Sequence, residues 1–189
     1  IAYEIRLQQA LEEDFLCPFH YFGITDAYID DVKLKDVDVE KALQTLTAEA
    51  RVDYVLEKAN FYGFSGSRVK GLIFCSRNEE ARLLSEKMNE KINPHTGNYY
   101  RTISVAGNNS QSEREKAIEK LVTDNLAEDY LDYIFSVDIF NEGVDIPEIN
   151  QVIMLRPTQS PIVFIQQLGR GLRKYQDKEY VVILDFIGN

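Results

Sequence analysis

Short apolar runs alternate with amphipathic segments along most of the chain. The run 69–75 is almost wholly apolar, which is typical of a strand buried on both faces of a parallel sheet. A segment rich in β-forming residues predicts a strand at 17–24, and further strands are predicted at 99–106, 130–137, 151–155 and 180–187. Helical spacing predicts helices at 3–13, 39–62 (as one helix or two), 78–92, 112–126 and 160–174. Strands that alternate with helices predict an α/β fold with a mostly parallel sheet.

Capping and turn residues predict where these elements begin. Asp38 is a candidate cap for the helix at 39–62, and either Ser76 or Asn78 is a candidate cap for the helix at 78–92. Ser112 and Glu115 have the spacing of a capping box for the next helix. The composition of 63–67 predicts a loop, and the acidic stretch 25–39 predicts a surface connection.

Length and composition limit the class of protein. The 189 residues suit one domain with at most a small appendage, and the 44% of hydrophobic residues is enough for a core. No stretch has the length of a membrane span, so we expect no membrane partner and a cytoplasmic location. The chain starts at Ile1 without a signal peptide or initiator Met, so we expect it to be cut from a longer protein.

Few residues are available for metal or disulfide chemistry. Cys17 and Cys75 lie far apart in apolar surroundings, which favours reduced thiols over a disulfide framework. The two histidines, His20 and His95, are too few for a His-based metal centre. We therefore expect no metal ligands in this chain.

The net charge of −10 argues against strong, indiscriminate adhesion to nucleic acid. The charge is uneven, however. Residues 11–58 carry twelve acids and five bases, whereas 151–189 carry five bases and three acids. An anion site is therefore expected in the C-terminal half.

The helix at 160–174 carries the most suggestive chemistry. At 3.6 residues per turn, Gln166, Arg170 and Arg173 fall on one stripe, and a separate apolar stripe can anchor the helix to a core. Gly169 and Gly171 each cost about 1 kcal/mol relative to Ala, and such residues often allow close approach to the backbone. A rigidly held arginine pair suits a phosphate. The alternative is an ordinary amphipathic helix with a solvated basic face.

Ligands of parallel sheets gather at the carboxyl ends of the strands. Ser76 and Arg77 follow one predicted strand and begin a helix, which suits an anion. Gly107 follows the next strand, and Gln111 and Arg114 share a helix face one turn apart. In each case the alternative is a plain capped helix with solvated side chains.

The segment 138–147 follows a third predicted strand and carries two spaced carboxylates, Asp138 and Asp145. Gly143 and Pro147 force a shaped loop. A carboxylate there could hold a sugar hydroxyl, as one does in dinucleotide folds. The alternative is that Asp138 caps a turn and Asp145 is a solvated loop acid.

The order of these motifs resembles the second RecA-like motor domain of a superfamily II helicase of the DEAD/DEAH type, nearest the restriction-enzyme and repair-helicase branch. Residues 72–77 resemble motif IV, Gly107 with Gln111 and Arg114 resembles the next backbone-binding element, 137–147 resembles motif V and 166–173 resembles motif VI. The likeness covers 17–189 and treats about 25–65 as an acidic helical insertion. Residues 1–16 resemble the tail of the first motor domain.

The resemblance implies a RecA-like three-layer domain with helices on both faces of the sheet. It implies that Arg170 is an arginine finger for the γ-phosphate, with Arg173 beside it, and that the remaining nucleotide contacts come from Gln166, Gly169, Gly143 and Asp145. It implies nucleic-acid backbone contacts from Ser76, Arg77, Gly107, Gln111, Arg114 and Asp138. Val137 and Ala106 depart from the Thr and His that many relatives have, which weakens the assignment of individual nucleic-acid contacts.

The chain has no phosphate-binding loop of the Gly-x-x-x-x-Gly-Lys-Ser/Thr kind and no magnesium-binding Asp-Glu pair after a buried strand. The resemblance therefore implies that ATP and Mg²⁺ are bound mainly by an absent first motor domain, which is also the expected partner. We expect half of an ATP-dependent DNA helicase or translocase, inactive as an isolated chain. The alternatives are a non-hydrolysing RecA-like module that binds nucleic acid or protein, and half of an RNA helicase. The absence of Gly-x-Gly-x-x-Gly after an early strand disfavours a dinucleotide-dependent enzyme.

Overall fold

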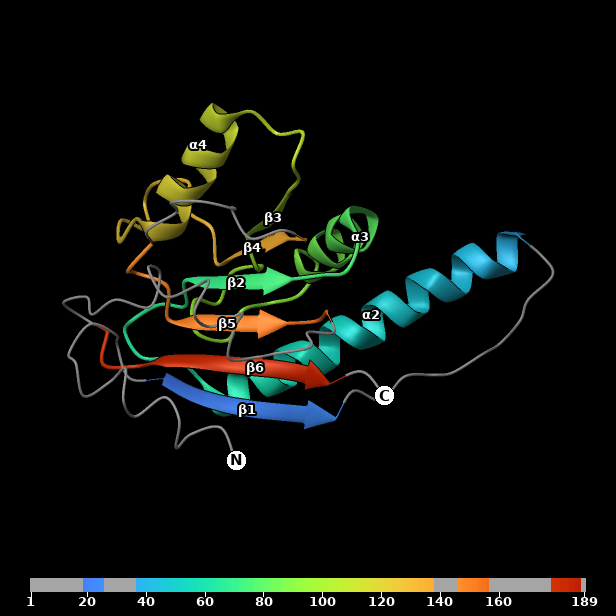
Figure 1. Ribbon diagram of the computed structural model, residues 1–189, viewed down its shortest axis with the longest axis horizontal. Coiled ribbons are helices and arrows are strands. Elements are labelled where there is room, and N and C mark those ends of the chain that lie inside the picture. Colours follow the sequence, from blue (N-terminus) through green and yellow to red (C-terminus); the bar gives the residue numbers. More distant parts are fainter. Residues whose placement is uncertain (1–18, 26–36, 138–145, 157–177, 188–189) are drawn as a thin grey trace.

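The computed structural model describes residues 19–25, 37–137, 146–156 and 178–187; for 25, 37–46 and 187 it describes only the backbone. One sheet has the strand order β1-β6-β5-β2-β4-β3, and every neighbouring pair is parallel (Figure 1). Its strands are β1 (Phe19–Thr25), β2 (Gly71–Phe74), β3 (Thr102–Val105), β4 (Tyr133–Ser136), β5 (Gln151–Met154) and β6 (Val181–Ile187). The described helices are α2 (Val37–Tyr62), α3 (Asn78–Met88) and α4 (Gln111–Val122).

Side chains that alternate along the strands build a separate core on each face of the sheet. In β2, Leu72 and Phe74 pack in the same core as Ala117 and Leu121 of α4. Ile73, between them, belongs to the other core, which also contains residues of α2 and α3. Because consecutive strand residues point to opposite faces, an almost wholly apolar strand needs cover on both sides. The predicted RecA-like, three-layer α/β fold is confirmed.

The helix predicted at 39–62 is present but begins earlier than predicted. It is one continuous helix, and it begins at Val37, so that Asp38 is a helical residue and the prediction that it caps the helix is wrong. Val52, Val55 and Ala59 recur at helical spacing and are almost fully buried, so that a single apolar stripe holds this half of the helix against the sheet.

The helix α3 ends at Met88, before the predicted residue 92, because polar contacts turn the chain toward β3. The Asn89 side chain accepts a hydrogen bond from the Thr102 backbone N–H at 2.8 Å and donates to the Thr102 carbonyl at 3.1 Å. An isolated antiparallel bridge then pairs Ile92 with Tyr99. A side chain that satisfies both backbone groups of the edge strand competes with a further turn of helix.

No helix within the described ranges is both long enough and apolar enough to cross a membrane.

Candidate nucleic-acid and nucleotide interface

Three strands end level with one another at the carboxyl edge of the sheet. Phe74 at the end of β2 pairs with Ser136 of β4, and Val105 at the end of β3 pairs with the same residue. The segments that begin at Cys75 and Ala106 therefore leave the sheet on either side of Val137. Because neighbouring strands lie about 4.8 Å apart, these two segments start roughly 10 Å from each other. The strand order therefore brings together the segments after β2, β3 and β4, which carry the candidate binding residues predicted from the sequence.

The turn from β2 into α3 leaves the start of that helix without a side-chain cap. The N-cap residue is Arg77, in an extended conformation, and its side chain makes no capping hydrogen bond. The prediction that Ser76 or Asn78 caps this helix is wrong. Ser76 and Arg77 are both exposed, and the first N–H groups of α3 have no intrahelical partner. Such groups can bind an anion such as a phosphate oxygen.

Two carboxylates also lie in the first turn of α3, from Glu79 and Glu80. Glu80 makes a long ion pair with Arg51 of α2, at 3.9 Å. Because these acids reduce the local positive potential, a phosphate here would be held by directed N–H groups and by Arg77 rather than by net charge.

The loop from β3 into α4 is held by its own side chains. The Ser110 hydroxyl accepts from the Glu113 N–H at 3.2 Å, and the Glu113 carboxylate accepts from the Ser110 N–H at 2.9 Å. Asn109 donates to the same carboxylate, and these hydrogen bonds lower the pKa of Glu113. The capping box is therefore Ser110 with Glu113, and the prediction that Ser112 and Glu115 form it is wrong. The Ser-x-x-Glu pattern occurs twice, two residues apart, and the first copy lies where the loop meets the helix.

Arg114 and Gln111, which the sequence places on one helix face, make separate contacts. The Arg114 guanidinium turns back and donates to the Gly107 carbonyl at 2.9 Å and, more weakly, to the Ala106 carbonyl at 3.4 Å. Gln111 instead donates to Glu115 at 3.0 Å. Arg114 thus holds the shape of the loop that carries Gly107.

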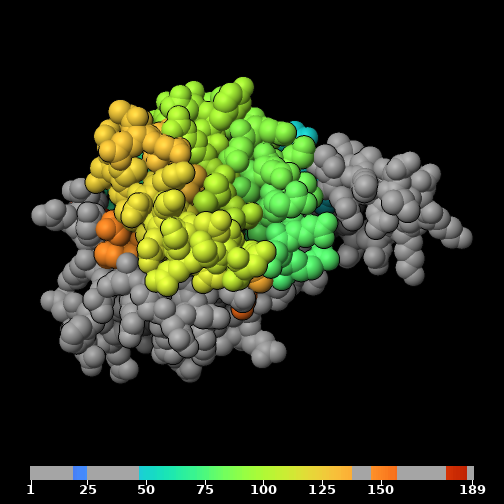
Figure 2. All heavy atoms as spheres, turned by 90° about the horizontal axis from the view of Figure 1, so that it is seen from above, coloured from blue at the N-terminus to red at the C-terminus, as the bar shows by residue number. Residues whose placement is uncertain are grey.

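Gly107 has space above it. A Cβ atom built on this residue would meet nothing within 4 Å. Its φ does not lie in the left-handed region that favours glycine. Since neither crowding nor backbone conformation explains the glycine, the space suits the close approach of another molecule. The loop and α4 lie on the face seen in Figure 2, where α4 is yellow and α3 is green.

Arg156 is a contributor that the sequence reasoning missed. It follows β5, and its guanidinium donates to the Val137 carbonyl at 2.8 Å. Since β2 lies between β4 and β5, this contact spans the end of one strand and fixes the start of the segment after β4. The sequence signal that could have identified Arg156 is its position as a cationic residue just after a predicted buried strand.

Several predicted site residues lie outside the described residues: Asp138, Gly143, Asp145, Gln166, Gly169, Arg170 and Arg173. The predicted helices at 3–13 and 160–174 lie outside them as well. Their roles stay predictions, as do the contacts proposed for Ser76, Arg77, Gly107, Gln111 and Arg114.

Within the described part of the chain, no group of three or more His, Cys, Asp or Glu residues could hold a metal ion. Cys75 is fully buried at the end of β2, and burial raises the pKa of its thiol far above the ordinary value. The thiolate is the reactive form, so this cysteine is inert at neutral pH.

Comparison with known proteins places these features in a family. The helicase conserved C-terminal domain matches residues 51–175. The chain is 26% identical over 191 residues to a Saccharomyces cerevisiae protein named as the ATP-dependent helicase IRC3, covering 100% of this chain and 26% of that protein. The chain thus spans about a quarter of this relative's length.

Two solved structures share the fold. A fragment of an HsdR subunit of a type I restriction enzyme from Vibrio vulnificus aligns with a TM-score of 0.62 and 20% identity, over 94% of this chain and 33% of that one. The ATP-dependent Type ISP restriction-modification enzyme LlaBIII, solved bound to DNA, aligns with a TM-score of 0.60 and 20% identity, over 93% of this chain and 12% of that one. From the family match and the RecA-like sheet, the chain belongs to the helicase conserved C-terminal domain family.

Proposed function

We propose that this chain is the second motor domain of an ATP-dependent DNA helicase or translocase. One observation carries the proposal: the register brings the uncapped start of α3 and the Gly107 loop to the same sheet edge, on either side of the segment that continues into 138–147. At this edge, the start of α3 and the Gly107 loop can bind phosphates of a nucleic-acid backbone while a neighbouring loop contacts the nucleotide. Family membership supports the same reading.

In this proposal the nucleic-acid backbone runs over the end of β4. Arg77 and the first N–H groups of α3 bind one phosphate, and Ser76 lies beside them. The Gly107 loop and the start of α4, with Gln111, bind another. Arg114 acts as a positioning residue, because its guanidinium is engaged by loop carbonyls. Contacts of this kind do not read sequence, which suits a motor that must move along any strand.

The nucleotide would bind between this domain and a first motor domain. Arg170 is the proposed arginine finger, with Arg173 as its neighbour on the helix that the sequence predicts at 160–174, which also carries Gln166 and Gly169. Asp145 and Gly143 would reach the ribose, and Asp138 the nucleic acid. The sequence has no phosphate-binding loop and no magnesium-binding Asp-Glu pair after a buried strand, so we assign Mg²⁺ and most of the ATP contacts to the other domain.

The choice of DNA over RNA rests on the amino-acid sequences of motifs V and VI, which resemble those of restriction and repair enzymes more than those of RNA helicases. The fold neighbour LlaBIII, which was solved with DNA bound, agrees with this choice. A competition between DNA and RNA strands of equal length for the full-length protein tests it, and tighter binding of RNA would refute it.

Replacing Arg77 by Gln in the full-length protein should weaken nucleic-acid binding several-fold. The change removes one exposed cation from the start of α3 and leaves the fold intact. Loss of one phosphate contact should also reduce the slope of log affinity against log salt by about 1. Fluorescence anisotropy of a labelled oligonucleotide over a series of salt concentrations measures both quantities.

Arg82→Gln is the matched control. Arg82 is also an exposed arginine of α3, but it lies past the first turn and pairs with Glu86 at 3.2 Å. Its loss should leave both affinity and salt slope unchanged. If the two variants show the same affinity and the same salt slope, Arg77 does not contact a backbone phosphate specifically.

The isolated 189-residue chain should show no ATP hydrolysis above background, with or without DNA. The chain lacks a phosphate-binding loop, and hydrolysis requires both walls of the nucleotide site. A coupled phosphate-release assay on the purified chain measures the rate. ATP hydrolysis by this chain alone would contradict the proposal that the nucleotide site needs residues from both motor domains.

A further inference from the structure

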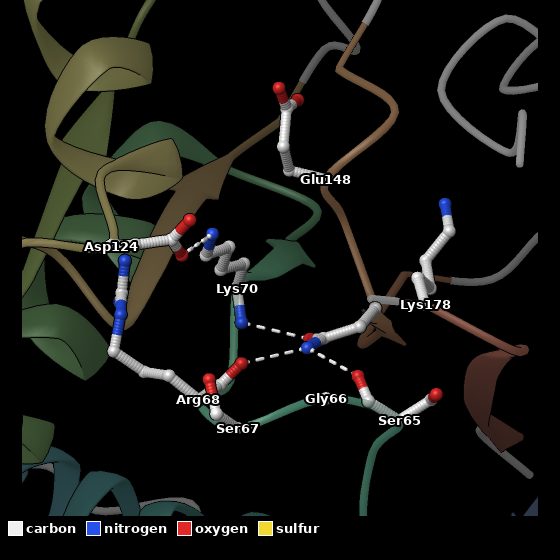
Figure 3. Close-up of a pocket in the computed structure, with 9 residues that line it drawn as sticks. Ser65, Gly66, Ser67, Arg68, Lys70, Asp124, Glu148 and Lys178 are labelled. Atoms are coloured by element: carbon white, nitrogen blue, oxygen red, sulfur yellow. Dashed lines mark hydrogen bonds and ion pairs between the residues drawn. The ribbon is translucent and has the colours of Figure 1, made fainter. Parts of the chain in front are cut away.

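A second concave site lies at the opposite, amino edge of the sheet. It is lined by Ser65, Gly66, Ser67, Arg68, Lys70, Asp124, Glu148, Asn150 and Lys178 (Figure 3). These residues come from the segment before β2, the segment just after α4, and the residues that precede β5 and β6. The described residues proposed to contact nucleic acid, at the starts of α3 and α4, lie at the carboxyl edge, so this pocket is separate from them.

Three buried cations dominate the pocket. Arg68, Lys70 and Lys178 are each only 7% exposed. Figure 3 shows Arg68 and Lys70 on one side of the pocket and Lys178 on the other. Two carboxylates, from Asp124 and Glu148, also line it, so the lining carries three positive and two negative formal charges. The net charge of the pocket is therefore positive, although the whole chain is strongly acidic.

The hydrogen bonds of the Arg68 guanidinium go to neutral carbonyl oxygens. The Arg68 guanidinium donates to the carbonyls of Leu121, Thr123 and Leu131, and its buried Nε has no partner within the described part of the chain. Lys178 donates to the Pro147 carbonyl. Lys70 contacts Asp124, whose side chain is 67% exposed. Because burying the positive charge of Arg68 among neutral carbonyls is costly, an anion that reaches its unpartnered Nε–H would gain electrostatic attraction.

The loop at the rim offers further donors in a fixed shape. Asn150 donates to the carbonyls of Ser65 and Arg68 at 2.9 and 2.8 Å, which ties the turn to the sheet. Gly66 adopts a φ of 114°, which a residue with a side chain rarely adopts. Among the described residues, the N–H groups of Gly66 and Ser67 and the Ser67 hydroxyl make no hydrogen bond. The rim thus carries free donors next to buried cations.

We propose that this pocket binds a small oxyanion, of the carboxylate or phosphate class. The cavity volume of about 30 Å³ holds roughly two water-sized atoms, which matches the two oxygens of a carboxylate or two oxygens of a phosphate. The rest of a larger ligand would lie outside. A carboxylate would come from an acidic side chain of another protein segment, and a phosphate from solution or from a phosphorylated ligand.

Anion titrations of the ¹⁵N-labelled full chain test the proposal. Sodium phosphate and sodium acetate are added in separate series, against sodium chloride at the same ionic strength. Saturable shifts are expected for the backbone amides of Gly66 and Ser67 and for the Nε–H of Arg68, with a dissociation constant in roughly the millimolar range. Saturation by phosphate alone assigns the site to phosphate, and saturation by acetate identifies a carboxylate site.

Ser67→Asp should weaken the binding of the added anion about tenfold or more, because a tethered carboxylate then occupies the rim. Ser67 is exposed, so this variant keeps the fold. Thr47→Asp, which replaces an exposed hydroxyl residue of α2 outside both sites, is the matched control and should bind as the parent does. The proposal is wrong if neither anion saturates, if chloride produces the same shifts, or if Ser67→Asp binds as tightly as the parent.

Discussion

Replacing Arg170 by Ala in the full-length protein should lower ATP turnover about 10³-fold or more while nucleic-acid binding is largely kept. A guanidinium that reaches the γ-phosphate stabilises the charge that spreads over the transferring phosphoryl group. Its loss therefore raises the barrier for hydrolysis, whereas the proposed backbone contacts at Arg77 and the Gly107 loop are unaffected. Steady-state ATPase assays and oligonucleotide binding on the same preparation measure the two effects.

Arg82→Ala provides the control, because it also removes an arginine from this domain but from an exposed surface of α3. It should leave turnover unchanged. If Arg170→Ala hydrolyses ATP as fast as the parent, the finger assignment fails and the alternative of a non-hydrolysing module stands. If turnover and nucleic-acid binding fall together, Arg170 has a structural role that the proposal does not include.

Replacing Arg68 by Met should lower the free energy of unfolding by about 3–5 kcal/mol. Arg68 lies before β2, and its guanidinium donates to Leu121 at 2.8 Å, Thr123 at 2.6 Å and Leu131 at 2.7 Å. It thereby caps the last turn of α4 and joins it to the residues that lead into β4. Methionine fills similar space but leaves the three carbonyls without these donors.

The same guanidinium lies 5.1 Å from the ring centre of Tyr130, which Arg101 contacts from 4.2 Å. Arg68→Lys should therefore recover only part of the loss, since one ammonium group cannot serve three carbonyls and stack on a ring. Urea unfolding followed by circular dichroism measures the effect as a lower midpoint. Arg82→Met should shift the unfolding free energy by no more than about 0.5 kcal/mol. A similarly small effect for Arg68→Met would show that water replaces the guanidinium without cost.

The order of strands and helices was predictable from the sequence because it depends on local periodicity. Apolar runs such as 69–75 must be covered on both faces, and that requirement alone predicts a parallel sheet between helices. The positions of Ser76, Arg77 and Gly107 directly after strands were predictable for the same reason. Each predicted strand is present, although β2, β3 and β4 are shorter than their apolar runs.

The tertiary structure decided which residues meet across long stretches of chain. Arg68 bonds to carbonyls 53 and 63 residues away, and no local pattern specifies such partners. It also decided between two equivalent capping patterns in favour of Ser110 and Glu113, and it turned Arg114 toward its own loop. The physical reason is that periodicity records which face a residue shows to the core, whereas hydrogen-bond partners depend on where the packed elements finally lie.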